Sequence, residues 1–254
     1  MRILVTNDDG ISANGLEALC SIARELTDDV WVVAPETNQS GVSHAITLHH
    51  PIRMRKIEEK RFSVQGTPTD CVLMGVEELL GDKKPDLVLS GVNRGQNMGD
   101  DVTYSGTIAG AMEGAILGIP SIALSQYINF AEGGRPDWTI SKTHGAGIIR
   151  KLLEKGWPKN VLMNINFPDR PPAEVAGIAV TRQGHRDGNL RKVDARQDTH
   201  GINYYWYDFR RAPLNLVEGT DIWAVHSGLI SVTPLSLNLT HDAVYEDLSK
   251  TFLE

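Results

Sequence analysis

A β-α-β unit within the first 35 residues constrains the fold of this chain most strongly. Residues 2–6 (RILVT) form a short apolar run that ends in a polar turn, as a buried strand does. Apolar residues at helical spacing follow over residues 14–26, and a second apolar run, VWVVA, covers residues 30–34 and stops at Pro35. Two strands joined by one helix run parallel, with a right-handed crossover. The chain is therefore predicted to build a parallel sheet.

The same rhythm of apolar runs and helical patterns continues to about residue 170. Strands are expected at 86–90, 120–125 and 160–166, helices at 67–80, 106–118 and 140–154, and an antiparallel pair at 46–57 and 61–65. After residue 168 the segments are short and β-like, at 175–182, 202–209, 221–226 and 229–234, before a closing helix at 241–252. We therefore predict an α/β fold with a doubly wound core over residues 1–170. Residues 171–254 are expected to form a β-hairpin extension and a final helix that contact another subunit.

The composition is that of a globular protein without a nucleic-acid or membrane surface. Apolar residues make up 41% of the 254 residues, which is enough for a sizeable core. The net charge is −7 without any block of five like charges, which argues against a face for a nucleic-acid duplex. No apolar run approaches the roughly 20 residues needed to span a bilayer, and the first residues are too polar for a signal peptide. Cys20 and Cys71 are expected to be buried, reduced thiols, so we expect a cytoplasmic protein.

Polar side chains concentrate in the loops that follow three of the predicted strands. Asp8 and Asp9 follow the first strand. Further hydroxyl, amide and carboxyl groups follow the second strand and the strand at 86–90: Asn38, Ser40, Ser43, Asn93, Asn97, Asp100, Asp101, Ser105 and Thr107. Ligands of open parallel sheets bind beyond the carboxyl ends of the strands, so these loops are expected to share one rim.

The oxygen atoms on this predicted rim are hard ligands, which suit Mg²⁺, Mn²⁺ or Ca²⁺. A bound cation would explain why the adjacent Asp8 and Asp9 stay ionised, since its charge outweighs their mutual repulsion. The alternative is a solvated turn in which Asp9 lies near the N-terminus of a helix and is favoured by the helix dipole. Both interpretations remain open on the residues alone.

The segment YSGTIAGAMEGA indicates a second site on the same rim. Ser105 and Thr107 flank Gly106 where a helix of small residues is predicted to begin. Free N–H groups, a glycine that permits close approach and two hydroxyls suit an anion such as phosphate. Serine and threonine are also favoured as ordinary helix caps. A cation site and an anion site together would equip the rim for phosphoryl transfer to water.

The sequence lacks the motifs that mark several other classes of enzyme. The first strand is not followed by G-x-G-x-x-G, and the chain contains no Walker motif, G-x-S-x-G or H-E-x-x-H. His44 is interpreted as a surface histidine, and Asp70 as a helix cap or a partner of the site. Asp100 and Asp101 are further partners of the site. Residues 182–186 (RQGHR) fit either a base or phosphate contact or a solvated hairpin face.

Five segments occur in the order found in one family: NDDGI, APETNQSGVSHAIT, QGTPTDCV, PDLVLSGVNRGQNMGDDVTYSGTIAGAMEG and PSIA. Over residues 1–126 the chain thus resembles the SurE family of metal-dependent 5'/3'-nucleotidases, also called stationary-phase survival proteins. The resemblance implies a Rossmann-like, three-layer α/β/α core. It also implies a homodimer or homotetramer that exchanges its C-terminal segment. Asn14 departs from the family, where proline is common, and residues 127–139 align with nothing.

The resemblance also implies the residues of the site and the reaction. One divalent metal ion per subunit, Mg²⁺ or Mn²⁺, would be held by Asp8, Asp9, Ser40 and Asn93. The phosphate would be held by Asn97, Ser105, Gly106 and Thr107. The implied reaction is hydrolysis of nucleoside 5'- and 3'-monophosphates by metal-activated water, with Asp8 and Asp9 as catalytic residues. Short polyphosphate is a further candidate substrate.

Three questions about the mechanism and class remain open at this stage. Direct attack by water is preferred to a phosphoryl-enzyme on Asp8, because a carboxylate bound to a metal is a poor nucleophile. A non-catalytic phosphate or nucleotide sensor on the same fold is the alternative function. A sugar-nucleotide transferase is disfavoured, since it would want an Asp-x-Asp pair rather than adjacent aspartates.

Overall fold

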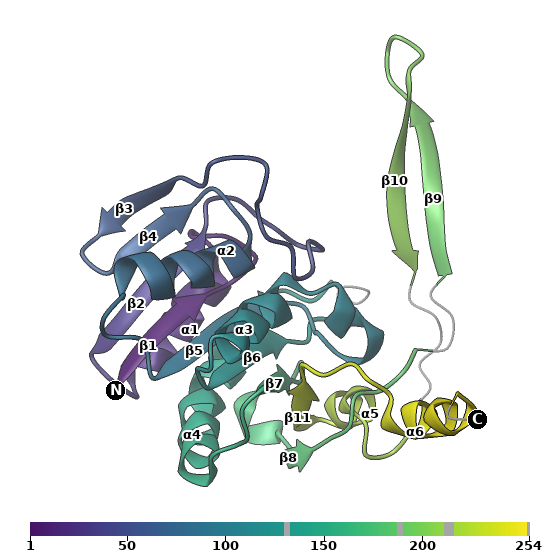
Figure 1. Ribbon diagram of the computed structural model, residues 1–254. Coiled ribbons are helices and arrows are strands. Elements are labelled where there is room, and N and C mark those ends of the chain that lie inside the picture. The colour runs from purple at the N-terminus through teal and green to yellow at the C-terminus, as the bar shows by residue number, and fades with distance from the viewer. Residues whose placement is uncertain (130–132, 187–189, 211–215, 253–254) are drawn as a thin grey trace.

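The computed structural model describes residues 1–129, 133–186, 190–210 and 216–252. Its centre is a nine-stranded sheet in the order β3-β4-β2-β1-β5-β6-β7-β11-β8 (Figure 1). The strands are β1 Arg2–Thr6, β2 Asp29–Pro35, β3 Met54–Glu58, β4 Arg61–Val64, β5 Leu87–Arg94, β6 Ser121–Gln126, β7 Val161–Phe167, β8 Gly177–Val180 and β11 Leu229–Ser236. Neighbouring strands from β4 to β7 run parallel, β3 pairs antiparallel with β4, and β11 pairs antiparallel with β7 but parallel with β8. The expectation of a mostly parallel α/β core is confirmed.

Helices cover both faces of this sheet. The helices that do so are α1 Asn14–Arg24, α2 Pro68–Leu73, α3 Gly106–Ile116, α4 Thr139–Lys155 and α5 Asp221–His226. The last helix, α6 Asp242–Thr251, has no buried residue, and two 3₁₀ turns lie at Gly99–Thr103 and Pro172–Glu174. Alternate residues of β1 face opposite layers: Ile3 packs in the cluster that contains α1 and α4, and Leu4 in the cluster that contains α2. α3 packs on the same side as α2. The sequence therefore builds the three expected layers.

Two helical segments differ from the sequence-based expectation. Residues 221–226 form the helix α5 rather than a strand, and Thr220 caps it by accepting a hydrogen bond from the Trp223 amide at 3.3 Å. A short apolar run does not distinguish a strand from a buried helical turn, which explains this error. The helix expected at 67–80 begins as α2, with the capping box of Thr67 and Asp70, and continues as the π-helix Met74–Leu79.

The C-terminal part contributes two strands to the central sheet and also forms a separate hairpin. β8 and β11 extend the central sheet, while β9 Leu190–Gln197 and β10 Asn203–Arg210 form a separate antiparallel hairpin. Figure 1 shows this hairpin projecting away from the body, with α6 at the outer end of the chain. The hairpin and the final helix are thus confirmed, whereas the division of the chain at residue 170 stays a prediction.

Two further expectations can be compared with the described residues. Cys20 and Cys71 are buried and free, as predicted. Within the described ranges, no helix has the length and apolar character needed to cross a membrane.

Candidate active site

The loop after β1 is closed by its own side chains. Asn7 donates from Nδ2 to the Gly10 carbonyl at 3.0 Å, and its Oδ1 accepts from the Gly10 amide at 3.3 Å. Gly10 has a φ of +104°, which favours glycine. The intervening Asp8 and Asp9 are consequently held on a tight turn at the carboxyl edge of the sheet, at the rim where the sequence predicts the site.

Asp8 is almost fully buried against the first turn of α3. Its Oδ1 accepts a hydrogen bond of 2.5 Å from the Thr107 hydroxyl. A Cβ added at Gly106 would lie 2.8 Å from the Asp8 Cβ and 3.1 Å from its Oδ2, so glycine is required for this approach. Burial raises the pKa of Asp8 to about 6, and the charge of Asp9 adds to this shift, while the bond from Thr107 opposes it.

Asp9 is half-buried beside the end of β5. Its Oδ2 accepts a hydrogen bond of 3.0 Å from the Arg94 amide. Burial raises the pKa of Asp9 above its ordinary value, although this bond and the Arg94 charge counteract the shift. Both carboxylates therefore lie where their ionised forms are disfavoured, which a bound cation would reverse.

A cavity of about 380 Å³ opens beside Asp8 at this edge. Five of the eight predicted site residues line it, namely Asp8, Ser40, Asn93, Asn97 and Ser105. We refer to it as the central cavity. Asp9 lines a neighbouring cavity instead, and Gly106 and Thr107 lie buried behind Asp8. The structure thus brings the three predicted loops together, and Thr107 reaches the site through Asp8.

The loop that carries Ser40 is fixed at several points. The Gln39 amide donates to the Asp8 carbonyl at 2.7 Å, and the Ser40 amide donates to Asn38 Oδ1 at 2.8 Å. Farther along the loop, the Ser43 hydroxyl donates to a backbone carbonyl, and His44 Nε2 lies 2.8 Å from Glu113 Oε2 on α3. His44 is thus a partly exposed histidine, as a surface position would be, and in addition it is paired with Glu113.

The amide side chains at the rim are oriented by bonds to their neighbours. Asn93 donates from Nδ2 to the Gly95 carbonyl at 2.9 Å, which leaves its Oδ1 to accept. Asn97 donates from Nδ2 to the Ser125 hydroxyl at 2.8 Å, and its backbone amide donates to Asn166 Oδ1 at 2.9 Å. The remaining N–H of each side-chain amide can still donate to a ligand.

A buried polar network under Asn97 is absent from the sequence-based prediction. Asn164 and Asn166 each donate from Nδ2 to the Asn97 carbonyl, at 2.8 and 3.1 Å. Their signal was present but weak, because asparagines in a run such as VLMNINF interrupt a strand that is otherwise apolar. Buried amides of this kind hold a backbone in one arrangement, and here the backbone carries Asn97.

Ser105 combines the two roles considered for it. Its Oγ accepts from the Ile108 amide at 3.0 Å and so caps α3, and the same residue lines the central cavity. The cap uses the oxygen as an acceptor, so the hydroxyl hydrogen can donate to an anion. Ser105 thus places a hydroxyl and the start of α3 at the site.

The acidic pair after Asn97 is braced by the segment that contains RQGHR. Asp100 accepts from the Arg186 amide at 2.8 Å and lies 3.0 Å from His185 Nδ1, and Asp101 accepts from the Arg186 guanidinium at 2.6 Å. Nearby, the buried Asp221 accepts from the Gly99 amide at 2.9 Å. Asp100 and Asp101 therefore support the loop, while Asp70, the remaining acid considered, caps α2.

The donor set at the rim fits a hard divalent cation. In the described part of the chain, no group of three or more His, Cys, Asp or Glu residues could hold a metal ion. A metal here would use the two aspartates together with hydroxyl and amide oxygens, a set typical of Mg²⁺ or Mn²⁺ sites. The buried carboxylate of Asp8 and the oriented Oδ1 of Asn93 are consistent with such a site.

The fold and the rim define an α/β protein with a polar ligand site at the carboxyl edge of a parallel sheet. The sequence profile of the family "Survival protein SurE" matches residues 3–189. The chain belongs to the SurE family.

Two relatives and one solved structure match this chain over almost its whole length. The chain is 55% identical over 252 residues to "5'-nucleotidase SurE" of Azorhizobium caulinodans, covering 99% of each chain. It is 58% identical over 244 residues to the protein of the same name from Methylorubrum populi, covering 95% of each. The crystal structure of the SurE protein from Aquifex aeolicus matches with a TM-score of 0.84 and 42% identity, covering 99% of each chain.

Proposed function

We propose that this chain hydrolyses nucleoside 5'- and 3'-monophosphates to nucleoside and phosphate, with short polyphosphate as a further substrate. One observation carries the proposal: the C-terminal ends of three parallel strands, β1, β2 and β5, bring Asp8, Ser40 and Asn93 into one cavity. Relatives that are at least 55% identical over nearly the full chain are named 5'-nucleotidases, which supports a nucleotidase. The residue roles below belong to the same proposal.

One divalent ion, Mg²⁺ or Mn²⁺, would be held by Asp8, Asp9, Ser40 and Asn93. When bound, such an ion polarises a phosphoryl oxygen and lowers the pKa of a coordinated water. Asp8 is suited to this role because Thr107 fixes one of its oxygens. Asn93 is suited to it because its bond to Gly95 orients the amide.

The phosphoryl group would be held by donors at the start of α3 and on the neighbouring loop. The Ser105 hydroxyl and the remaining N–H of Asn97 would donate to its oxygens as charge develops. The oxygen of a water molecule forms the new bond to phosphorus, and the ester oxygen leaves and takes up a proton. Direct attack by water remains our preference, because Asp8 is buried and already bonded to Thr107.

The test is phosphate release from AMP by the purified protein, after chelation and again after addition of Mn²⁺ or Mg²⁺. We expect release only with the metal, and loss of release in Asp9→Asn. Calorimetric titration of the metal into the same variant should show weaker binding. If nucleotide binds but no phosphate is released from AMP, other 5'- and 3'-nucleotides or polyphosphate, the protein is a nucleotide sensor instead.

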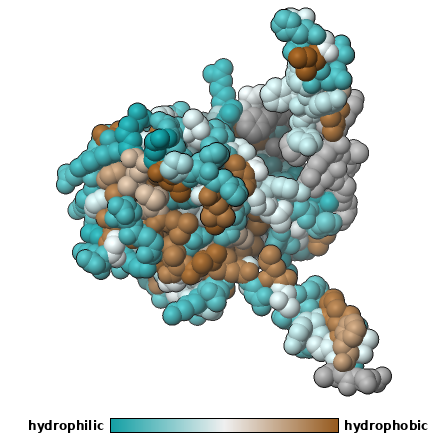
Figure 2. Space-filling model, turned by 45° about the horizontal axis from the view of Figure 1, so that its top comes forward, coloured by the Kyte–Doolittle hydropathy of each residue, from teal (hydrophilic) through white to brown (hydrophobic). Residues whose placement is uncertain are grey.

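The C-terminal elements support a homodimer or a homotetramer. α6 has no buried residue, and its apolar side chains Val244, Leu248 and Phe252 are exposed. Figure 2 shows brown, apolar surface on the projecting C-terminal segment. On β10, Tyr205 and Trp206 are also exposed. Because exposed apolar surface of this kind is unusual on a monomer, we propose that both elements contact another subunit. The two free thiols support the proposal of a cytoplasmic protein.

A further inference from the structure

A second cavity adjoins the central one and has no assigned role. Its volume is about 530 Å³, within the range of sites that bind small molecules. Arg94 lines both cavities, and the consecutive Asp8 and Asp9 line one each. The second cavity, which we call the Trp138 cavity, is therefore the immediate neighbour of the central cavity.

The walls of the Trp138 cavity combine an aromatic ring, cationic groups and amides. Trp138 and Arg135 come from the segment before α4, and Asn14 comes from the start of α1. Asn38 also lines the cavity, and its Oδ1 is occupied by the Ser40 amide, which leaves the amide nitrogen to donate. Indole and guanidinium planes are surfaces on which nucleobases stack.

Packing against the core holds the Trp138 side chain in place. The ring is half-buried and packs against the core cluster that contains α1 and α4. A Cβ added at Gly15 would lie 3.1 Å from the Trp138 ring and 2.1 Å from the Val92 carbonyl, so a glycine is needed for this close packing. A ring held on one side by the core keeps little rotational freedom to lose when a ligand binds its other side.

We propose that the Trp138 cavity is the nucleoside subsite of this protein. The base packs against Trp138 with the Arg135 guanidinium beside it, and the sugar lies toward Asp9 and Arg94, next to the phosphate site. This inference rests on the proposed nucleotidase function. It assigns substrate selectivity to residues 135–138, in the segment before α4.

A third cavity, of about 340 Å³, also meets the central one, at Ser105. It is lined largely by apolar side chains, among them Ile116, Leu235 and Leu237. Polar side chains such as His44 and Gln183 lie among them, but the lining is more apolar than that of the Trp138 cavity, and the polar edges of a nucleoside are costly to bury without partners. The Trp138 cavity is the better match, and the apolar cavity provides the competing outcome of the test.

The test compares substrates with and without a base in Trp138→Leu and Arg135→Ala. For each protein, kcat/KM is measured for AMP and for ribose 5-phosphate in the presence of Mn²⁺. We expect the ratio of the two values to fall about tenfold in Trp138→Leu, as the loss of one base–aromatic contact predicts. A smaller fall is expected in Arg135→Ala. An unchanged ratio in both variants, or a fall only in Ile116→Ser, overturns the proposal.

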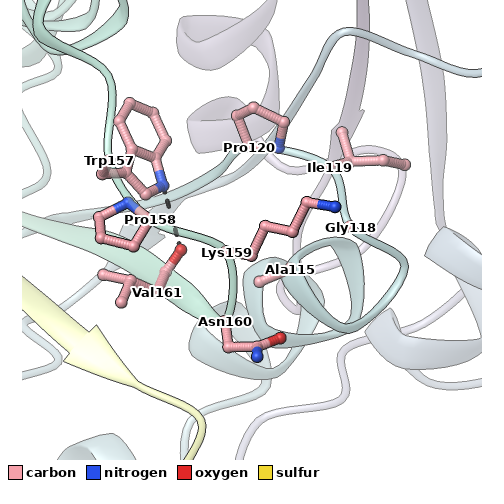
Figure 3. Close-up of a pocket in the computed structure, with 9 residues that line it drawn as sticks. All are labelled: Ala115, Gly118, Ile119, Pro120, Trp157, Pro158, Lys159, Asn160 and Val161. Carbon is pink, nitrogen blue, oxygen red and sulfur yellow. Dashed lines mark hydrogen bonds between the residues drawn. The ribbon is translucent and has the colours of Figure 1, made fainter.

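Trp157→Leu is the matched control for Trp138→Leu. Trp157 is also half-buried and packs against the same core cluster, but it lines a depression of only about 50 Å³ at the opposite edge of the sheet (Figure 3). Its Nε1 donates to the Val161 carbonyl at 3.0 Å. Trp157→Leu is expected to lower the melting temperature while the substrate ratio stays within twofold.

A direct binding measurement separates this proposal from the proposed function. Adenosine is titrated calorimetrically into the wild type and into Trp138→Leu, without any requirement for turnover. Binding that weakens about tenfold in the variant supports the subsite even if AMP is not hydrolysed. Equal binding by both proteins contradicts the assignment of this subsite even if AMP hydrolysis is confirmed.

Discussion

Thr107 donates a 2.5 Å hydrogen bond to Asp8, and both residues are buried. The bond joins the first turn of α3 to the loop after β1, two elements that are 99 residues apart in sequence. A hydrogen bond to a carboxylate favours its ionised form, so Thr107 opposes the effect of burial on the pKa of Asp8. The bond thereby keeps Asp8 closer to the charge state that binds a cation.

Thr107→Val should weaken metal binding at the rim. Valine keeps the shape of threonine but cannot donate to Asp8 Oδ1, so the pKa of Asp8 rises further. Loss of such a supporting bond typically weakens metal affinity by about 10- to 100-fold. Calorimetric titration with Mn²⁺ at pH 7 measures this, and Thr107→Ser, which keeps the hydroxyl, should bind nearly as the wild type. Equal affinities of the valine variant and the wild type would contradict the role assigned to Thr107.

Gly106→Ala should displace Asp8 without unfolding the protein. The added methyl group would lie 2.8 Å from the Asp8 Cβ, which is closer than unbonded carbon atoms approach. Such overpacking costs about 1–3 kcal/mol of stability, and metal binding should fall with it. Gly147→Ala is the control, because Gly147 lies on the exposed face of α4 with no atom near its added Cβ. That variant should gain about 0.5–1 kcal/mol in chemical unfolding.

The stability of the metal-free protein should depend on pH through Asp8. Its pKa is raised from 3.8 to about 6 on folding, so the folded state binds more protons than the unfolded state between these values. The free energy of unfolding therefore falls as pH rises through this window, and a shift of about 2 pH units corresponds to about 3 kcal/mol.

Asp8→Asn isolates this contribution from that of the other carboxylates. Relative to the wild type, the variant should gain about 3 kcal/mol between pH 4 and pH 7.5 in urea unfolding with a chelator present. Mg²⁺ at pH 7.5 should raise the melting temperature of the wild type and leave that of the variant unchanged. A difference between the two proteins that does not vary with pH would show that Asp8 does not titrate in this window.

The sequence predicts the rim well because sheet topology alone determines it. Once β1, β2 and β5 run parallel as neighbours, the loops with Asp8, Ser40 and Asn93 must meet at one edge. No contact between distant residues has to be known for this conclusion. Whether these residues bind a metal stays a prediction.

The remaining features depend on packing between distant segments, which a single sequence does not reveal. Asn164 and Asn166 lie inside a strand, and their bonds to the Asn97 carbonyl appear only once β7 and the loop are placed together. Asp221 is similar, because it binds the Gly99 and Gly184 amides from within a segment expected to be a strand. Polar residues of this kind look like ordinary surface positions until their partners are known.

The exposed apolar face of α6 should control the oligomeric state. Val244 and Leu248 are four residues apart and therefore share one face of the helix. Replacing both with serine removes apolar contact area, so we expect a lower molecular mass at micromolar concentration by light scattering after gel filtration. Glu246→Ser, on the opposite face of α6, is the control and should leave the mass unchanged. The same mass for all three proteins would show that α6 does not contribute to the interface.

The His44–Glu113 pair should hold the loop that carries Ser40. Glu113 is buried on α3, and the pair joins α3 to a residue only four positions after Ser40. In His44→Ala the carboxyl group loses this partner, which typically costs about 1–3 kcal/mol.

A double-mutant cycle with His44→Ala, Glu113→Ala and the combined variant measures the contribution of this pair. The combined variant should be less destabilised than the sum of the single variants, with a coupling energy of about 1 kcal/mol or more in urea unfolding. If the pair also positions Ser40, His44→Ala should weaken Mn²⁺ binding, and a second substitution at Glu113 should weaken it little further. Additive losses of stability together with unchanged metal affinity would mean that the Ser40 loop is held by its backbone contacts to Asp8 and by Ser43.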